Sequence, residues 1–293
     1  MFIDANGKTW YKGNLHTHTT VTDGKKTPEE VIALYRENGY DFLSLTDHWK
    51  HSETRMTDDG MLLLRGCEYN INGADILAGV FHIVAIGERE PAKLDRELAN
   101  GTYTAQDIVD AIHAVGGSAI LAHPAWSLNH PDEALCLKGF SAVEIYNSVS
   151  DANQSSRPYS GYFVDLIANK GMFLNIAATD DVHYYNGSDE TKSYIMVKAD
   201  SLDDVFEAIK NGDYYATQGP EVHVRREGDK LICDCSECVK IDFLSNAAWG
   251  PDRITRGKDL THAQYQIKPF DKWVRVEVLD ENGNYAWSNI IKI

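Results

Sequence analysis

The sequence predicts an α/β fold, in which a barrel of strand–helix units is followed by a small antiparallel β domain. Short apolar runs alternate with helical patterns about seven times in residues 1–218, and this alternation is typical of βα units around a parallel sheet. After Gly219-Pro220, short alternating runs separated by turn residues replace the pattern. We therefore expect a barrel domain at residues 1–218 and a small all-β domain at residues 219–293.

The strands expected in the barrel are apolar runs at residues 10–15, 42–46, 61–64, 80–86, 118–122, 142–146, 172–178 and 195–198. Thr27-Pro28-Glu29-Glu30 begins a helix, because it supplies an N-cap, a proline at the first helical position and acids in the first turn. Gly39 ends that helix. Apolar residues at helical spacing predict further helices at residues 104–115, 159–170 and 202–210.

The strands expected in the β domain are shorter, at residues 222–225, 231–233, 239–244, 263–267 and 273–278. Asp280-Glu281-Asn282-Gly283-Asn284 is a hairpin signal. Cys233, Cys235 and Cys238 form a C-x-C-x-x-C pattern, which is either a zinc or redox site or three small structural residues. The structural interpretation is favoured because no second Cys/His pair follows nearby.

Composition excludes several classes of protein. The chain has 293 residues and a net charge of −16, which opposes docking on duplex nucleic acid because such docking depends on Lys and Arg. The start of the chain lacks the pattern of a signal peptide, and no apolar run approaches the roughly 18 residues of a membrane span. Five cysteines, an odd number, do not suggest a disulfide framework. We expect a cytoplasmic protein with no membrane partner.

Metal-ligating residue types recur where the predicted strands end. His16 and His18 lie two residues apart at the end of the first strand, so both side chains point to one face. Further ligand types at or just after strand ends are His48, His123, Asp181 and His183. In βα barrels the reacting groups lie at the C-terminal ends of the strands. Imidazoles and carboxylates without thiolates suit Zn, Mn or Fe(II).

The ordered motifs resemble those of the PHP (polymerase and histidinol phosphatase) superfamily over about residues 10–216. The matching motifs are His16-x-His18 with Thr22-Asp23-Gly24, Thr46-Asp47-His48, Gly66-x-Glu68, His82, Ala122-His123-Pro124 and Asp181-x-His183. The tail resembles the β domain of CehA/McbA-type PHP metallohydrolases, at Gly219-Pro220, Trp273-Val274-Arg275-Val276-Glu277 and Ala286-Trp287-Ser288-Asn289.

The resemblance implies a distorted (β/α)7 barrel, two or three divalent metal ions and hydrolysis of phosphate esters. It implies that a first metal is held by His16, His18, Glu68 and Asp181. It implies that Glu68 bridges to a second metal, which His82 and His123 complete. It implies that a third metal is held by Asp23, His48 and His183. The D-x-H spacing favours Asp181 over Asp180 as the ligand. A water trapped between two such ions would be acidified to a hydroxide nucleophile.

Other residues near these motifs have two interpretations each. In the functional interpretation, Asp47 orients a ligand imidazole or lies near the leaving oxygen. In the structural interpretation, it caps the turn that follows. Arg157 either grips a non-scissile phosphate or is an exposed arginine at a helix start. The aromatic residues after the ligand motifs either stack on a planar substrate group or pack as a roof; they are Trp49, Trp126, Tyr184 and Tyr185.

The function expected from the residues and the resemblance together is that of a metal-dependent phosphoesterase. Its substrate would be a small phosphate mono- or diester of nucleotide or short oligonucleotide type, including 5′–3′ exonuclease-like action, and not duplex nucleic acid. One alternative, suggested by the tail, is a metal-dependent carbamate or ester hydrolase. A second is a non-catalytic metal-binding regulatory module, which the full set of ligand-type residues disfavours. The sequence leaves the oligomeric state open.

Overall fold

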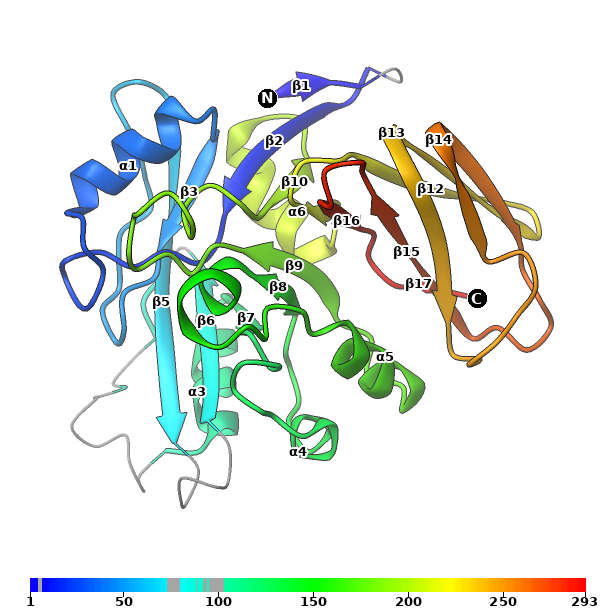
Figure 1. The fold of residues 1–293 in the computed structure, drawn as a ribbon. Helices are drawn as coiled ribbons and strands as arrows, with labels where there is room; N and C mark the ends of the chain where they lie inside the picture. Colours follow the sequence, from blue (N-terminus) through cyan, green and yellow to red (C-terminus); the bar gives the residue numbers. More distant parts are fainter. Residues whose placement is uncertain (5–6, 73–79, 88, 92–93, 95–102) are drawn as a thin grey trace.

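The computed structural model describes residues 1–4, 7–72, 80–87, 89–91, 94 and 103–293. Its strands form a large mixed sheet with helices packed along it, so the predicted α/β class is confirmed (Figure 1). The chain begins at the top of Figure 1 and ends among the C-terminal strands on the right of the view. The first strand, β1 (Phe2–Ile3), pairs antiparallel with β2.

Seven strands, each paired with the next, position the candidate site: β2 (Thr9–Asn14), β3 (Phe42–Leu45), β5 (Leu62–Asn72), β6 (Val80–Gly87), β7 (Ser118–Leu121), β8 (Ala142–Asn147) and β9 (Asn175–Thr179). β2, β3 and β5 run parallel to one another, and so do β7, β8 and β9. The prediction of a wholly parallel sheet is wrong, because β6 is antiparallel to both of its neighbours. The link from Asn72 to Val80 is shorter than the dozen or so residues that a parallel crossover needs.

A closed barrel is not confirmed, because the sheet does not close. β10 (Tyr194–Lys198) pairs antiparallel with β2 and with β11 (Tyr214–Thr217) instead of extending the parallel order. Beyond the ends of β2 and β9, an isolated parallel bridge joins Thr17 to Val182. Its hydrogen bonds run from Asp181 N to His16 O at 2.9 Å and from His18 N to Val182 O at 3.1 Å. The segments that follow β2 and β9, both of which carry ligand-type residues, are therefore joined directly to each other.

The helices are α1 (Pro28–Glu37), α3 (Ala105–Ala114), α4 (Pro131–Leu135), α5 (Gly161–Asn169) and α6 (Val205–Asn211). The predicted start of the first helix is confirmed, since Thr27 and Glu30 form a capping box. The helix expected at residues 202–210 begins instead with a 3-10 turn at Leu202–Asp204, and a π-helical turn at Ser150–Gln154 was not predicted. No helix in the described part of the chain is both long and apolar enough to cross a membrane.

The C-terminal strands pair antiparallel: β12 (Val222–Glu227), β13 (Lys230–Ser245), β14 (Ile254–Gln266), β15 (Trp273–Leu279), β16 (Tyr285–Trp287) and β17 (Ile291–Lys292). The two short runs expected at residues 231–233 and 239–244 are one long strand, β13, whose register shifts on either side of Cys238. Such bulges let a strand bend without ending. A short β4 (Arg55–Met56) pairs with β5.

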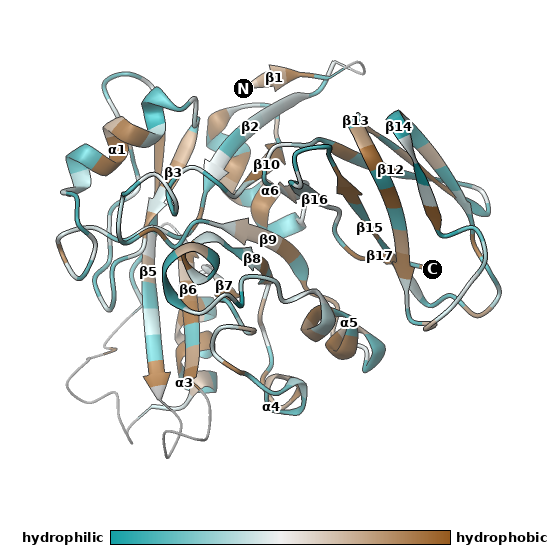
Figure 2. Cartoon of the chain, viewed as in Figure 1, coloured by the Kyte–Doolittle hydropathy of each residue, from teal (hydrophilic) through white to brown (hydrophobic). Residues whose placement is uncertain are grey.

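Two hydrophobic cores interlock at the junction of the two parts of the chain. The core of the C-terminal strands includes Trp10, Met196 and Tyr215 from the N-terminal part. Trp287 of β16 belongs in turn to the core of the N-terminal strands. Figure 2 shows brown and teal residues interspersed along β12–β14, as expected for strands with one apolar face. The domain boundary at residue 219 stays a prediction, because burial across it is continuous.

Replacing Trp287 tests this junction. Trp287 is fully buried and stacks on Tyr285, with ring centroids 5.7 Å apart, and on Tyr146 at the same separation. Trp287→Ala should lower the free energy of unfolding by about 3–5 kcal/mol, because it leaves a large cavity between the two cores. Urea unfolding followed by circular dichroism measures this. A loss below about 1 kcal/mol would show that the two cores are energetically independent at this point.

Candidate metal centre

The strand ends bring the nine ligand-type residues of the sequence motifs to one edge of the sheet. His16, His18 and Asp23 follow β2, His48 follows β3 and His123 follows β7. Glu68 lies within β5 and His82 within β6. Asp181 and His183 follow β9. His82 lies near the start of β6 and shares this edge because β6 is antiparallel. Its carbonyl accepts a hydrogen bond from Ala122 N at 3.1 Å, beside His123.

Glu68 lies at the centre of the cluster and is 1% exposed. Its Oε1 lies 2.7 Å from His82 Nδ1 and 3.3 Å from His123 Nε2. Its Oε2 lies 3.1 Å from His18 Nε2 and 3.1 Å from His48 Nδ1. The two oxygens of one carboxylate therefore face two different sets of imidazoles.

A buried inner group consists of His16, His18, Glu68 and Asp181. Asp181 Oδ1 lies 3.1 Å from His16 Nε2 and 3.1 Å from His18 Nε2. Asp181 has φ 52° and His123 has φ 29°, values that non-glycine residues rarely adopt. Such backbone strain is retained where the surroundings hold a side chain in one direction, and it gathers at functional sites.

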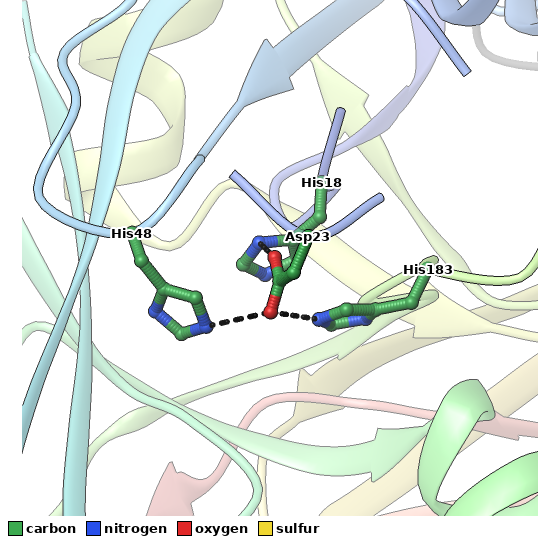
Figure 3. Close-up of side chains that lie close together, drawn as sticks. All are labelled: His18, Asp23, His48 and His183. Carbon is green, nitrogen blue, oxygen red and sulfur yellow. Dashed lines mark ion pairs between the residues drawn. The ribbon is translucent and has the colours of Figure 1, made fainter. Parts of the chain in front are cut away.

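A second group, of His18, Asp23, His48 and His183, lies at the outer side of the cluster. Figure 3 shows His48 and His183 pointing at the same oxygen of Asp23 from opposite sides; Oδ2 lies 3.6 Å from His48 Nε2 and 3.4 Å from His183 Nε2. The Asp23 side chain is 49% exposed, so the cluster opens to solvent here. Gly24 is required beside it, since a Cβ there would collide with the backbone of His18.

A carboxylate that the sequence motifs did not single out supports the cluster from behind. Glu144 of β8 is 1% exposed, and its Oε1 lies 2.7 Å from His16 Nδ1. Its other oxygen accepts hydrogen bonds from His123 N at 2.9 Å and from the amide of Asn147 at 3.0 Å. The same Asn147 amide donates to Asp181 Oδ2 at 3.1 Å. A glutamate inside the apolar run 142–146 was the available signal, because a buried charge in a strand needs a partner.

The charges of the cluster shift its pKa values in opposite directions. Burial alone would raise the pKa of Glu68, but the imidazoles of His16, His48 and His82 hold it well below its ordinary value. Burial opposes the charged form of His16, yet Asp181, Glu68 and Glu144 raise its pKa well above the ordinary value. Burial lowers the pKa of His48 to about 4. The carboxylates therefore remain charged at neutral pH, as ligands of a cation must be.

Several imidazole nitrogens and carboxylate oxygens of the cluster lie close together, some of them without a hydrogen bond among the described residues. His16 Nε2 and His18 Nε2 lie 3.2 Å apart, while His16 Nδ1 is held by Glu144. His18 Nδ1, His48 Nδ1 and Asp181 Oδ1 are buried without a hydrogen-bond partner among the described residues. Buried polar atoms are normally satisfied, so this convergence calls for a proton or a cation. The residues present fit divalent metal ions with mixed N and O ligands.

The structure gives Asp47 and Asp180 distinct positions behind the ligand-type residues. Asp47 accepts hydrogen bonds from Thr19 N at 2.9 Å and from the hydroxyls of Thr19 and Thr22, each at 2.7 Å, which fixes the turn leading to Asp23. Asp180 is fully buried and accepts from Tyr35 and from the backbone of 191–193. Burial raises the pKa of Asp180 to about 6. Asp181, not Asp180, lies in the ligand groups.

The four aromatic residues after the ligand motifs divide into two pairs. Trp49 Nε1 donates to Asn70 at 2.7 Å, and the Tyr185 hydroxyl donates to His18 O, so both are fixed as supports. Trp126 lies against His123 and His82, with ring centroids 4.9 and 5.4 Å apart. Tyr184 is 41% exposed, and its ring centroid is 6.4 Å from that of His183. Trp126 and Tyr184 thus lie beside different histidines of the cluster.

Arg157 is exposed and reaches the loop that follows His123. Its guanidinium donates to Trp126 O at 3.4 Å. The remaining five histidines make contacts elsewhere: His51 with Tyr69, His113 with Gly139, His130 with Asp132, His223 with Glu221 and His262 with Asp234. The three clustered cysteines are free thiols on β13, and Cys233 and Cys238 are buried. Cys235 Sγ and Cys238 Sγ lie 3.7 Å apart.

Comparison with solved structures identifies the fold. No family profile and no curated protein sequence matches the chain. The structure is similar to a two-domain protein from Bacteroides vulgatus that contains a predicted PHP-like metal-dependent phosphoesterase, with a TM-score of 0.54 and 18% identity over 100% of this chain and 97% of that one. The two proteins therefore share a fold, which confirms the PHP-like resemblance at the level of the fold. The CehA/McbA-like character of the tail stays a prediction.

Two further structures are similar to part of the chain. One is a lesion-specific endonuclease from Pyrococcus furiosus, with 16% identity and a TM-score of 0.46 over 69% of this chain and 56% of that one. The other is an amidohydrolase from Chromobacterium violaceum, with 17% identity and a TM-score of 0.43 over 60% of this chain and 89% of that one. Both TM-scores lie below 0.5, so neither defines the fold of this chain.

Replacing Glu144 tests its support of the cluster. Glu144→Gln keeps the shape but removes the charge that holds His16 Nδ1, so we expect metal affinity to fall about 10- to 100-fold with the fold retained. Isothermal titration with Mn or Zn measures the affinity, and circular dichroism checks the fold. Glu133→Gln, at an exposed carboxylate in α4, is the matched control. Unchanged affinity in Glu144→Gln would show that His16 needs no support from Glu144.

Proposed function

We propose that this protein is a metal-dependent phosphoesterase that hydrolyses small phosphate mono- or diesters. The observation that carries the proposal is the position of Glu68, a buried carboxylate whose two oxygens face separate sets of imidazoles. This is the arrangement expected of a carboxylate that bridges two cations. The similarity of the whole fold to a PHP-like two-domain protein agrees with it.

The proposed ligands fall into three sets. His16, His18, Glu68 and Asp181 would hold a first ion. Glu68, His82 and His123 would hold a second, and Asp23, His48 and His183 a third. When bound, divalent ions supply positive charge that polarises a phosphate ester and acidifies water. Zn, Mn and Fe(II) all suit this ligand set.

The chain itself contributes positioning and exclusion of water. Glu144 and Asn147 fix His16 and Asp181 from behind, and Asp47 fixes the turn that carries Asp23. The inner group is buried, whereas Asp23 is half exposed, so a substrate would approach from the Asp23 side. A rigid ligand shell costs little reorganisation during the reaction, which favours catalysis.

The surroundings of the cluster favour a compact anion with a planar group. The net charge of −16 disfavours long nucleic acid, since duplex affinity comes mainly from Lys and Arg that neutralise phosphates. Trp126 and Tyr184 lie beside different histidines of the cluster and offer rings for stacking. Arg157 beside Trp126 would pair with a second phosphate, as in a nucleotide bisphosphate.

The metal content of the purified protein tests the ligand assignment. We expect two or three transition-metal ions per chain after loading with Mn or Zn, because the three proposed ligand sets converge at this edge of the sheet. Elemental analysis gives the count, and a chelator should lower the melting temperature because bound metal stabilises only the native state. Replacing Cys233, Cys235 and Cys238 together with Ala should leave the count unchanged. Less than one ion per chain would contradict the assignment.

A substrate panel tests the reaction. A nucleotide bisphosphate, an aryl phosphate, an aryl phosphodiester, a short single strand, a duplex, a carbamate and a carboxyl ester are compared at physiological salt. We expect the small phosphate esters to turn over fastest, and Glu68→Gln to abolish turnover while the fold persists, because an amide cannot bridge two cations equally well.

Each other result of the panel has a defined meaning. Faster cleavage of the duplex would refute the argument from charge. Turnover of carbamates or carboxyl esters alone would refute the phosphate assignment and favour the ester-hydrolase alternative. Metal binding without turnover of any substrate would favour a regulatory module. Normal activity of Glu68→Gln would show that Glu68 is not the bridge.

A further inference from the structure

Strand β15 lies between the C-terminal core and the N-terminal part of the chain. Because side chains of a strand alternate, one face of β15 lies in the C-terminal core: Val274, Val276 and Val278. The opposite face carries Trp273, Arg275 and Glu277. Trp273 Nε1 donates to Asn169 of α5 at 3.2 Å. The polar face of β15 thus faces α5 and the segment before it.

Arg275 is the central residue of this contact and is 1% exposed. Its guanidinium binds both oxygens of Asp165 in α5, at 2.7 and 3.0 Å, and also donates to Glu277. The Tyr159 hydroxyl donates to the same Glu277 oxygen. A fully buried guanidinium needs such pairing, so the contact specifies one arrangement of β15, α5 and Tyr159.

Tyr159 belongs to a segment, residues 157–160, that we call the rim segment. It runs beside the end of β8, through a bridge between Tyr146 and Tyr159, a hydrogen bond from Asn147 N to Pro158 O at 3.1 Å and one from Ser160 N to Ile145 O at 2.8 Å. Asn147 is the residue whose amide contacts Glu144 and Asp181. The rim segment therefore adjoins the support of the metal centre.

The rim segment also contacts the loop after His123. Ser160 Oγ accepts a hydrogen bond from Ala125 N at 3.1 Å, and Arg157 donates to Trp126 O at 3.4 Å. Trp126 in turn lies against the rings of His82 and His123. Residues from β15 to the cluster are thus connected by a continuous chain of contacts through Tyr159.

We propose that Arg275 and Glu277, acting through Tyr159, are positioning residues that hold the rim segment so that Arg157 and Trp126 face the substrate beside the metal centre. The proposal rests on the proposed phosphoesterase function and adds a role for the C-terminal strands in it. These strands form part of the substrate-binding apparatus without contributing a metal ligand. Their role is to fix the substrate-facing loops, not the metals.

Tyr159→Phe is the mildest test, because it removes only the hydroxyl that binds Glu277. With a nucleotide bisphosphate, which would engage both Arg157 and Trp126, we expect KM to rise roughly fivefold, the size of one net hydrogen bond, with kcat and metal content unchanged. Gly161→Ala should act likewise, since a Cβ there would collide with the Tyr159 ring while Arg275 keeps Asp165. Hydrogen exchange of the peptides covering 123–127 and 144–160 should become faster in both variants.

Arg253→Met is the matched control. Arg253 is also a buried arginine of the C-terminal part, paired with Asp271 at 2.8 Å, but its contacts among the described residues are with the C-terminal strands and their loops. It should lower stability while leaving KM and the exchange of 144–160 at wild-type values. The proposal is overturned if Tyr159→Phe and Gly161→Ala both behave as wild type, or if Arg253→Met causes the same changes.

The outcome separates this proposal from the proposed function. If the wild-type protein hydrolyses no phosphate ester, the proposed function fails, and the exchange comparison alone decides the positioning role. Faster exchange of 144–160 in Tyr159→Phe than in Arg253→Met would then support it, and equal exchange would overturn it. A loss of metal in Tyr159→Phe would also overturn it, because the proposal assigns the contact to the substrate side.

Discussion

Burial of the Glu68 carboxylate at the centre of the strand ends is the constraint on which the rest of the site depends. A buried carboxylate is tolerated only when charges or donors surround it, and here imidazoles from β2, β3, β6 and β7 do so at 2.7 to 3.3 Å. The five rings come from four strands, so those strands must meet at one edge. The reversed direction of β6, which the short link after β5 favours, brings His82 to the edge where its parallel neighbours end.

The polar groups behind the cluster are held in place by hydrogen bonds from neighbouring residues. Glu144 receives hydrogen bonds from His123 N and Asn147 besides its contact with His16, and Asp47 accepts three from Thr19 and Thr22. Three ligand-type atoms, on His18, His48 and Asp181, make no hydrogen bond among the described residues and have only the ion-pair contacts of the cluster. The supporting carboxylates are thus held by hydrogen bonds while these ligand-type atoms lie beside one another, an arrangement suited to cations.

The C-terminal strands are coupled to this site by packing and by charge. Trp10 and Tyr215 enter their core, and Trp287 enters the core of the N-terminal strands. Trp273, Arg275 and Glu277, three residues of one tail motif, face the N-terminal part and not solvent. Asn289 extends the same junction, because its side chain accepts from Ile176 N at 2.6 Å and donates to Gly212 O and Tyr214 O. The motif residues of the tail are thus explained by the surface they contact.

The sequence by itself determined the α/β class, most strand and helix positions and the set of ligand-type residues, because period, capping at Thr27 and the H-x-H and D-x-H spacings are local properties. Only the tertiary structure decided the pairing of β6 with β7, the continuity of β13 and the open edge of the sheet, since these depend on which strands pair and in which register. It also decided the role of Glu144: a glutamate inside an apolar strand signals that it needs a partner, but its partners, His16 and His123, lie 128 and 21 residues away in the sequence.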